Sequence, residues 1–199
     1  MSLMLLWRHA PTGYNADGRL QGSLDVPLGH EGRAQAARAA RRIVARYGED
    51  LRIVSSPLAR ALDTADELAT LIAGDVAVDD GLTQRPYGAW EGLTWADIQA
   101  RWPEQLAARQ RGLDPDIPGW GRSSDVAARV GAALRRQWDE ERTTVVVSHG
   151  SAIQLGLLDL VGLDPLSRVF GSVPHAAWHE VLQVESGAWH VDAFAVGAD

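Results

Sequence analysis

The amino-acid sequence predicts a three-layer α/β/α sandwich with a mainly parallel central sheet, formed by a single domain over residues 1–199. Three observations support this fold class. Short apolar runs of strand length alternate with longer amphipathic segments, which is the pattern of parallel strands joined by helices. A chain of 199 residues is long enough to bury one sizeable core. Its 46% hydrophobic and 23% charged residues are typical of a globular protein rather than a disordered or membrane protein.

The first half of the chain is expected to alternate between strands and helices. The expected strands are residues 3–7, 51–54 and 76–78, which are short apolar runs. Residues 11–29 are rich in glycine and proline and are expected to form a loop. In residues 31–47, small apolar side chains recur between arginines, which predicts an amphipathic helix that ends at Gly48. A second helix is expected over residues 58–72, with Pro57 where a first helical turn tolerates proline.

The second half continues the alternation and ends in a hairpin. The expected strands are residues 143–147, 178–184 and 188–194, and the expected helices are 93–111, a segment from about residue 123, and 151–161. Pro103 should break the first of these helices. Residues 114–121 hold prolines and glycines and should form a loop or hinge. Ser123 or Ser124 is expected to cap the following helix, and Ser186-Gly187 to turn the hairpin.

The composition excludes several classes of function. A net charge of −7 disfavours non-specific nucleic-acid binding. The absence of cysteine excludes disulfides, thiolate metal sites and a cysteine nucleophile. All nineteen basic residues are arginine, so lysine bases and Schiff bases are excluded as well. No targeting segment or membrane span is visible, and a cytoplasmic location is expected. Eight tryptophans are compatible with a homodimer patch and do not establish one.

Two histidines and two arginines follow three of the expected strands. Arg8 and His9 come directly after the first strand, Arg60 follows the second, and His149 follows residues 143–147. Ligands of open α/β sheets bind outside the carboxyl ends of the strands, so these side chains are expected to converge. Taken singly, Arg60 is more often a solvated helix residue and His149 a satisfied core residue. Their joint placement favours a functional site.

A phosphoryl group is the ligand that suits this set. Arginine forks match the geometry of phosphoryl oxygens. A neutral imidazole such as His9 can attack phosphorus, and neighbouring arginines favour its neutral form. A second histidine can donate to oxygens that gain charge in the transition state. The loop after His9 adds the polar residues Thr12, Tyr14, Asn15 and Gln21. Metal binding by the two histidines is disfavoured, because no carboxylate or third histidine stands at ligand spacing.

Five motifs in order along the chain resemble those of one known family. They are L-W-R-H-A-P-T at 6–12, R-L-Q-G at 19–22 with D-V-P-L at 25–28, S-S-P-L-A-R-A at 55–61 with T-A at 64–65, Y-G-A-W-E-G-L-T at 87–94, and V-S-H-G at 147–150. They are similar to the motifs of the histidine phosphatase superfamily, whose members are also called phosphoglycerate mutase-like proteins. Within it, the chain most resembles the small broad-specificity phosphatases and the glucosyl-3-phosphoglycerate phosphatases of mycobacteria.

The resemblance implies a phosphomonoesterase that acts on a small phosphorylated metabolite and needs no metal or other cofactor. His9 would be the nucleophile that becomes phosphohistidine, and Arg8, Arg60 and His149 would hold the phosphoryl group. The resemblance also implies phosphate or substrate contacts for a second set of residues. These are Thr12, Asn15, Gln21 and Gly150. Transfer from phosphohistidine to water gives a phosphatase, whereas transfer back to substrate gives a mutase; both are kept as alternatives.

Four residues depart from the family pattern. Ala10 stands where glycine is usual, Gly29 where a threonine or serine usually caps a helix, and Arg122 where glutamate is common. The departure with chemical weight is Gln84, at the position of the family's glutamate general acid. An amide cannot protonate an alkoxide, and general acid catalysis is typically worth about 10²–10⁴-fold in rate.

Three explanations of Gln84 follow. Another carboxylate, Glu91 or an aspartate, takes over as the acid. Alternatively, the leaving group needs no proton, as in phosphohistidine, acyl phosphates or nitrophenyl esters, which allows phosphohistidine phosphatase activity. In the third, the protein has lost most of its catalysis and binds a phosphorylated ligand. We therefore expect a slow or leaving-group-restricted phosphatase.

A lid over the site is expected from residues 93–122, which are rich in tryptophan, proline and arginine. Four arginines of this segment would suit an acidic substrate, although a solvated helical face explains any one of them equally well. They are Arg101, Arg109, Arg111 and Arg122.

Overall fold

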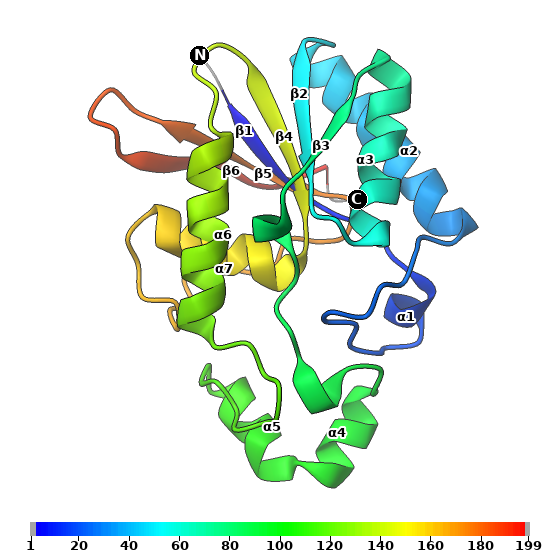
Figure 1. The fold of residues 1–199 in the computed structure, drawn as a ribbon, viewed down its shortest axis with the longest axis vertical. Helices are drawn as coiled ribbons and strands as arrows, with labels where there is room; N and C mark the ends of the chain where they lie inside the picture. The colour runs from blue at the N-terminus through cyan, green and yellow to red at the C-terminus, as the bar shows by residue number, and fades with distance from the viewer. Residues whose placement is uncertain (1–2, 198–199) are drawn as a thin grey trace.

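The computed structural model describes residues 3–197 and contains one six-stranded sheet (Figure 1). Residues 1, 2, 198 and 199 of the expected domain lie outside this part. The strands are β1 (Met4–Arg8), β2 (Leu51–Ser55), β3 (Val76–Val78), β4 (Thr143–Ser148), β5 (Trp178–Gln183) and β6 (Trp189–Val196). Their order in the sheet is β3-β2-β4-β1-β5-β6. The first four run parallel and the β5–β6 hairpin is antiparallel, which confirms the predicted mainly parallel sheet.

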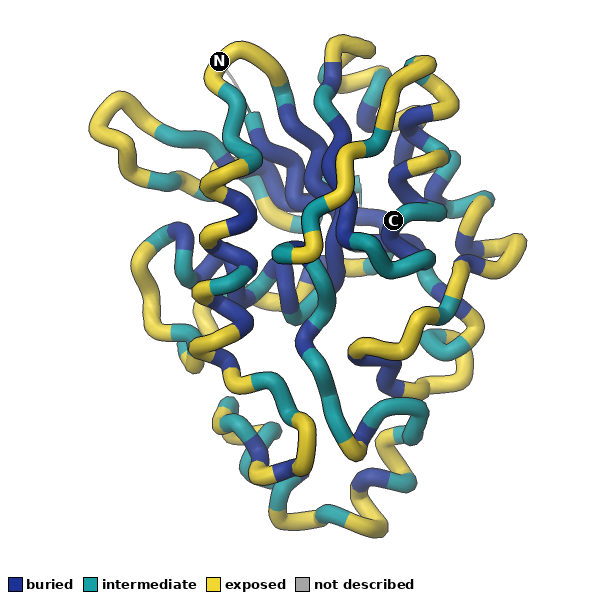
Figure 2. The backbone as a smooth tube through the Cα atoms, viewed as in Figure 1, coloured by how far each residue is buried: buried dark blue, intermediate teal, exposed yellow. Residues whose placement is uncertain are grey.

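Helices cover both faces of the sheet. The helices are α1 (Gly13–Ala16), α2 (His30–Tyr47), α3 (Ala59–Ile72), α4 (Trp95–Arg101), α5 (Pro103–Gln110), α6 (Ser123–Gln137) and α7 (Gly150–Leu160), with short 3-10 turns η1 (Asp80–Leu82) and η2 (Gly88–Trp90). Side chains of β1 alternate between the faces, as strand geometry requires. Met4 and Leu6 pack with α6 and α7, whereas Leu5 and Trp7 pack with α2 and α3. This arrangement confirms the three-layer sandwich, and its strands form the buried centre of Figure 2.

The glycine-rich segment 11–29 contains a helix that the sequence did not predict. Thr12 caps the four-residue helix α1, and its hydroxyl and main chain share a capping box with Asn15. A single helical turn has too few residues to show apolar periodicity, so only the Thr12–Asn15 spacing could have indicated it. The turn brings Asn15 back towards β1.

The predicted helix starts differ from the observed ones by one or two residues, and at two helices the role predicted for a residue at the start was wrong. Ser123 is the first residue of α6 rather than its cap, which is Arg122. Its hydroxyl instead donates to Asp114 and accepts from Arg85. At α3, Leu58 is the cap and Pro57 precedes it, so the proline lies just outside the first turn. The predicted break at Pro103 is confirmed by the separation of α4 from α5.

The segment from α4 to the start of α6 lies beyond the end of the sheet, at the bottom of Figure 1. It has an apolar cluster of its own, formed by Leu20, Trp90, Ile98, Leu106 and Ile117. Leu20 belongs to the loop after β1, so this cluster joins the α4–α5 segment to that loop. Among residues 3–197, no helix combines the length and apolar character needed to cross a membrane.

The residue that follows α3, its C-cap, offers a direct test of backbone strain. Ala73 is exposed and adopts a left-handed conformation with φ of 51°, where glycine is the residue that fits. We expect Ala73→Gly to raise the free energy of unfolding by about 0.5–1 kcal/mol, measured by urea denaturation. The matched substitution Ala37→Gly in the middle of α2 should lower it by about 1 kcal/mol. If both changes were destabilising, the strain at Ala73 would not be significant.

Candidate active site

A cavity of about 230 Å³ opens at the carboxyl end of β1. It is lined by Arg8, His9, Asn15, Gly18, Arg19, Leu20, Gln21, Gly22, Arg60, Gln84, Tyr87 and Trp95. Six of the residues proposed from the sequence are in this set: Arg8, His9, Asn15, Gln21, Arg60 and Gln84. Thr12, His149 and Gly150 are not among the residues that line the cavity. The parallel strands bring these residues together because their carboxyl ends share one edge of the sheet.

His9 is positioned with one ring nitrogen free. Its Nδ1 lies 2.7 Å from the main-chain oxygen of Ala10, which can only accept a hydrogen bond. The proton therefore sits on Nδ1, and Nε2 carries the lone pair. Burial lowers the pKa of His9 well below its usual value, and the charge of Arg60 lowers it further. The side chain is thus a neutral imidazole at physiological pH, as a nitrogen nucleophile must be.

Arg8 is held along one side by the segment before β5. Its Nη1 donates to the main-chain oxygen of Val173 at 2.7 Å, and its Nη2 lies 2.8 Å from Nε2 of His175. A side chain at Gly150 would place its Cβ only 3.2 Å from Cζ of Arg8. Glycine at this first position of α7 therefore lets the guanidinium pack closely against the helix start.

Arg60 and His149 form a buried pair next to His9. Nε of Arg60 donates to Nδ1 of His149 at 3.2 Å, so the proton of His149 is on Nε2, 2.8 Å from the hydroxyl of Ser56. The His149 and His9 ring centroids are 5.1 Å apart. Burial lowers the pKa of Arg60 to about 10, so it remains a cation at neutral pH. The pKa of His149 is also well below its usual value, first because of burial and then because of Arg60.

Asn15 and Gln21 present oriented amides. The oxygen of Asn15 accepts from the main chain and hydroxyl of Thr12 and from the amide of Gln21. Because that oxygen is occupied, the Asn15 amide nitrogen is the group left to donate towards a ligand. Thr12 is thus a support for Asn15 and does not line the cavity.

Gln84 lines the catalytic cavity and also a neighbouring cavity of about 530 Å³. Its side-chain oxygen accepts from the main-chain N–H of Arg85 at 2.9 Å. This bond identifies the oxygen end, since an N–H can only donate. The amide nitrogen of Gln84 is therefore the end available to donate to a ligand.

No aspartate or glutamate of residues 3–197 is among the residues that line the catalytic cavity. The side chain of Glu91 instead accepts from the main-chain N–H groups of Ser23 and Tyr87, at 2.8 and 2.9 Å. Glu91 thus links the loops that contain Ser23 and Tyr87, and it does not line the cavity. This geometry does not support Glu91 as the replacement acid considered from the sequence.

Several contributors to the site were missed by sequence reasoning. Ser56 contacts His149, and His175 contacts Arg8. Six residues that were not predicted line the cavity: Gly18, Arg19, Leu20, Gly22, Tyr87 and Trp95. Tyr87 and Ser56 stand inside two of the quoted motifs, which was a usable signal. His175 is a lone histidine in the long loop before β5, and nothing in its local sequence links it to Arg8.

A second, basic cavity lies next to Tyr87. It has about 170 Å³ and is lined by Arg85, Arg109 and Arg168 together with Ser123, Ser151, Ser167, Ser172 and Gln154. The Tyr87 hydroxyl lies 2.7 Å from the Ser151 hydroxyl, so one hydrogen bond links the residues of the two cavities.

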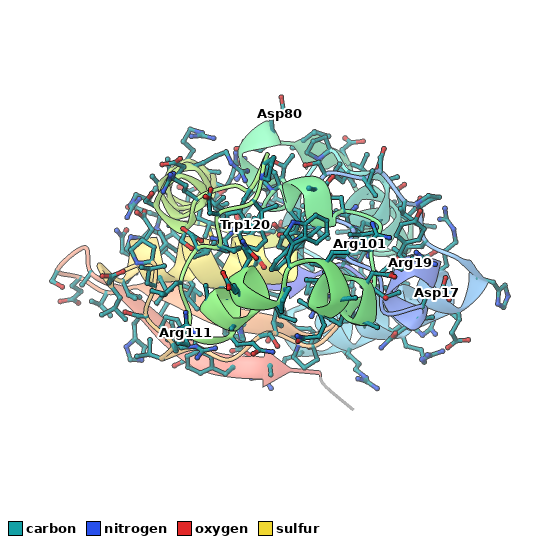
Figure 3. All side chains as sticks on the ribbon, turned by 90° about the horizontal axis from the view of Figure 1, so that it is seen from below. Asp17, Arg19, Asp80, Arg101, Arg111 and Trp120 are labelled. Atoms are coloured by element: carbon teal, nitrogen blue, oxygen red, sulfur yellow. The ribbon has the colours of Figure 1, made fainter. Side chains whose placement is uncertain are left out.

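The other arginines expected over the site lie elsewhere. Arg101 and Arg111 are exposed and line neither of these two cavities. They lie at opposite sides of the α4–α5 segment, seen from below in Figure 3. Arg122 lines the cavity next to Gln84.

Within residues 3–197, no cluster of three or more histidine, aspartate or glutamate side chains has the geometry to hold a metal ion. The cationic side chains that line the cavity are those of Arg8, Arg19 and Arg60.

Known proteins of one family are similar to this chain in sequence and in structure. A sequence model of the histidine phosphatase superfamily (branch 1) matches residues 4–196. Glucosyl-3-phosphoglycerate phosphatase of Mycobacterium tuberculosis is 33% identical over 98% of this chain and 95% of its own length. The structure of a mycobacterial glucosyl-3-phosphoglycerate phosphatase in complex with VO3 matches with a TM-score of 0.85 and 34% identity, covering 98% of each chain. Phosphoserine phosphatase of Entamoeba histolytica, in complex with 3-phosphoglyceric acid, matches with a TM-score of 0.81 and 27% identity, covering 98% of this chain and 96% of that one.

Proposed function

This chain belongs to the histidine phosphatase superfamily, and we propose that it hydrolyses a phosphate monoester of a small metabolite through a phosphohistidine at His9. The observation that carries the proposal is the state of His9. Its Nδ1 proton is hydrogen-bonded to the main-chain oxygen of Ala10, and its Nε2 carries the lone pair. The cavity around it holds the buried cation Arg60 and, among residues 3–197, no carboxylate.

The reaction follows in two steps. The Nε2 lone pair of His9 forms a bond to phosphorus while the ester P–O bond breaks, and that electron pair leaves on the oxygen of the alcohol. A water oxygen then attacks phosphorus, the N–P bond breaks and its electron pair returns to Nε2, while the protons of the water leave with the inorganic phosphate. Arg8, Arg60 and the amide of Asn15 stabilise the negative oxygens of the phosphoryl group throughout. Nδ1 keeps its proton on Ala10 in both steps, which holds the ring in one orientation.

Gln84 restricts which esters react quickly. Its amide nitrogen donates a hydrogen bond to the substrate but cannot transfer a proton to a departing alkoxide. Leaving groups that depart without a proton, such as carboxylates, phenolates or a neutral imidazole, are therefore favoured over alkoxides. A phosphatase of this kind is slow on ordinary alkyl phosphates.

The basic cavity beyond Tyr87 supports a substrate with a second anionic group. Arg85, Arg109 and Arg168 come from three separate segments and face one small volume. Arginines with surrounding hydroxyl groups are suited to a carboxylate. The names of the related proteins given above point to phosphorylated substrates of that type. We therefore propose a phosphorylated carboxylic acid as the substrate class.

A matched panel of esters tests both parts of the proposal. Initial rates are compared for glycerol phosphate against 3-phosphoglycerate, ethanolamine phosphate against phosphoserine, and nitrophenyl phosphate as the activated reference. We expect KM to be at least about tenfold lower for the member of each pair with a carboxylate, from one added charge-assisted contact. Activity should persist in EDTA, because Arg8 and Arg60 supply the positive field. Equal KM values would contradict the second anion site, and loss of activity in EDTA with recovery on adding a divalent cation would contradict the mechanism.

A protein that only binds phosphorylated ligands is the remaining alternative from another class. It would keep Arg8 and Arg60 and bind phosphate without turnover. Alkaline quenching, which preserves the acid-labile P–N bond, after incubation with a radiolabelled phosphoryl donor separates the two, since only the enzyme retains label on His9.

A further inference from the structure

His175 lies in the loop that joins α7 to β5. It lies beside the carboxyl end of β1 and is not among the residues that line the 230 Å³ cavity. Its Nε2 is 2.8 Å from Nη2 of Arg8, and its Nδ1 is 3.1 Å from the main-chain oxygen of His9. Its ring also meets the His9 ring edge-on, with centroids 5.2 Å apart. One side chain therefore contacts two of the residues proposed to handle the phosphoryl group, Arg8 and His9.

The partners of His175 fix its chemical state. Arg8 can only donate, so Nε2 of His175 must accept, and the proton must be on Nδ1. The main-chain oxygen of His9 can only accept, so Nδ1–H donates to it. Both bonds require the neutral Nδ1–H tautomer, and the burial that lowers the pKa of His175 to about 4, helped by Arg8, keeps it neutral at physiological pH.

The loop around His175 is anchored independently of the imidazole. Ala176 N–H donates to the main-chain oxygen of Arg8 at 3.1 Å, and Arg8 N–H donates to Ala177 at 3.0 Å. The indole of Trp7 donates to the oxygen of Ala176 at 3.0 Å. Ala176 holds a left-handed conformation with φ of 59°, an uncommon backbone for alanine that follows directly after His175. Changes to the imidazole therefore leave the docking of the loop intact.

We propose that His175 is a positioning residue, which orients Arg8 for the phosphoryl group and holds the main chain at His9. Arg8 carries a large charged side chain on a flexible stem, and an accepting imidazole restricts it to one arrangement. The second bond fixes the peptide between His9 and Ala10. The next peptide along the chain carries the Ala10 oxygen, which accepts from the His9 ring and orients it. The inference rests on the phosphate site of the proposed function and adds a residue that touches neither substrate nor reacting atoms.

Three substitutions separate the two bonds. His175→Gln places an accepting oxygen near the position of Nε2 and keeps the bond to Arg8. His175→Asn places its amide near Nδ1 and keeps only the bond to the main chain of His9. His175→Phe keeps ring size and removes both. His190, an exposed histidine on β6, provides the control His190→Phe.

Binding of inorganic phosphate and vanadate is measured by calorimetry, alongside kcat and KM for nitrophenyl phosphate. We expect the dissociation constant for vanadate to rise at least about tenfold in His175→Phe and His175→Asn, as for loss of a hydrogen bond to a charged group. His175→Gln should stay within about threefold of the wild type, and the control should not change. Thermal unfolding shows which variants are folded. If His175→Phe does not fold, the comparison of His175→Gln with His175→Asn still tests the proposal.

The outcomes distinguish this inference from the proposed function. If His175→Gln binds vanadate no better than His175→Asn, the positioning role is wrong. If the wild type binds phosphate and the glutamine variant rescues binding, but no ester is turned over, the positioning role stands and the hydrolytic function fails. A wild type that binds neither phosphate nor vanadate would overturn both.

Discussion

His9→Ala is expected to lower kcat/KM for nitrophenyl phosphate below about one-thousandth of the wild-type value, because the covalent route through the nucleophile is lost. The free Nε2 of His9 has no substitute nearby. His149 is turned towards Ser56 and His175 towards Arg8, so both neighbouring imidazoles are already committed to protein groups. Steady-state kinetics on purified protein measures the effect, and alkaline quenching should find phosphohistidine in the wild type and none in the variant.

A loss of activity alone would also follow from damage to the fold, so phosphate binding is the control. Arg8 and Arg60 remain in His9→Ala, and phosphate should still bind. His190→Ala, at an exposed position on β6, should behave as the wild type. A His9→Ala protein that keeps a tenth of the wild-type activity would show that His9 is not the nucleophile.

Gln84→Glu is expected to increase kcat on alkyl phosphates by at least about tenfold. General acid catalysis is typically worth about 10²–10⁴-fold, and the lower bound is reduced here because the new carboxyl is not perfectly placed. The substitution is almost isosteric and puts a titratable carboxyl where the amide now lines the cavity. The gain on nitrophenyl phosphate should be small, because phenolate leaves without a proton. The slope of log kcat against the pKa of the leaving group, over a series of aryl and alkyl esters, measures the difference.

Two further variants identify the source of the effect. Gln84→Met keeps the size and removes the amide donor, and should lower the rate on all esters alike. Glu91→Gln weakens the bonds to Ser23 and Tyr87, and should lower the thermal midpoint without changing the slope. Equal gains on alkyl and aryl phosphates in Gln84→Glu would mean that another residue already donates the proton.

Much of the architecture follows from local sequence pattern. The strand at 76–78 has the predicted bounds, and the other strands differ by at most two residues at either end. Apolar runs and amphipathic helices are signals within a short window, so the three-layer fold is readable from them. The one-turn helix α1 was missed because it depends on the capping box of Thr12 with Asn15. The caps of α3 and α6, Leu58 and Arg122, were misplaced because neither makes a side-chain capping bond that its residue type could have indicated.

The site divides in the same way. Arg8, His9 and Arg60 were expected from their places after strands, and the structure brings them to one cavity. His175 depends on a contact across 167 residues that no local pattern records. The diversion of Glu91 to the N–H groups of Ser23 and Tyr87 likewise depends on the loops that meet around it. Sequence therefore indicates which groups are present, while long-range contacts decide which of them face the substrate.

The place of β1 in the sheet also dictates when the site is assembled during synthesis. β1 is the first strand made, yet its two neighbours, β4 and β5, begin at Thr143 and Trp178. A nascent chain therefore carries β1 without a partner strand until β4 has been made, and without its second neighbour until β5 has been made. Such non-local pairing slows folding and exposes strand edges in the interim. A chain that stops before β5 keeps Arg8, His9 and Arg60, but the strand that precedes His9 then has an open edge on the side where β5 pairs.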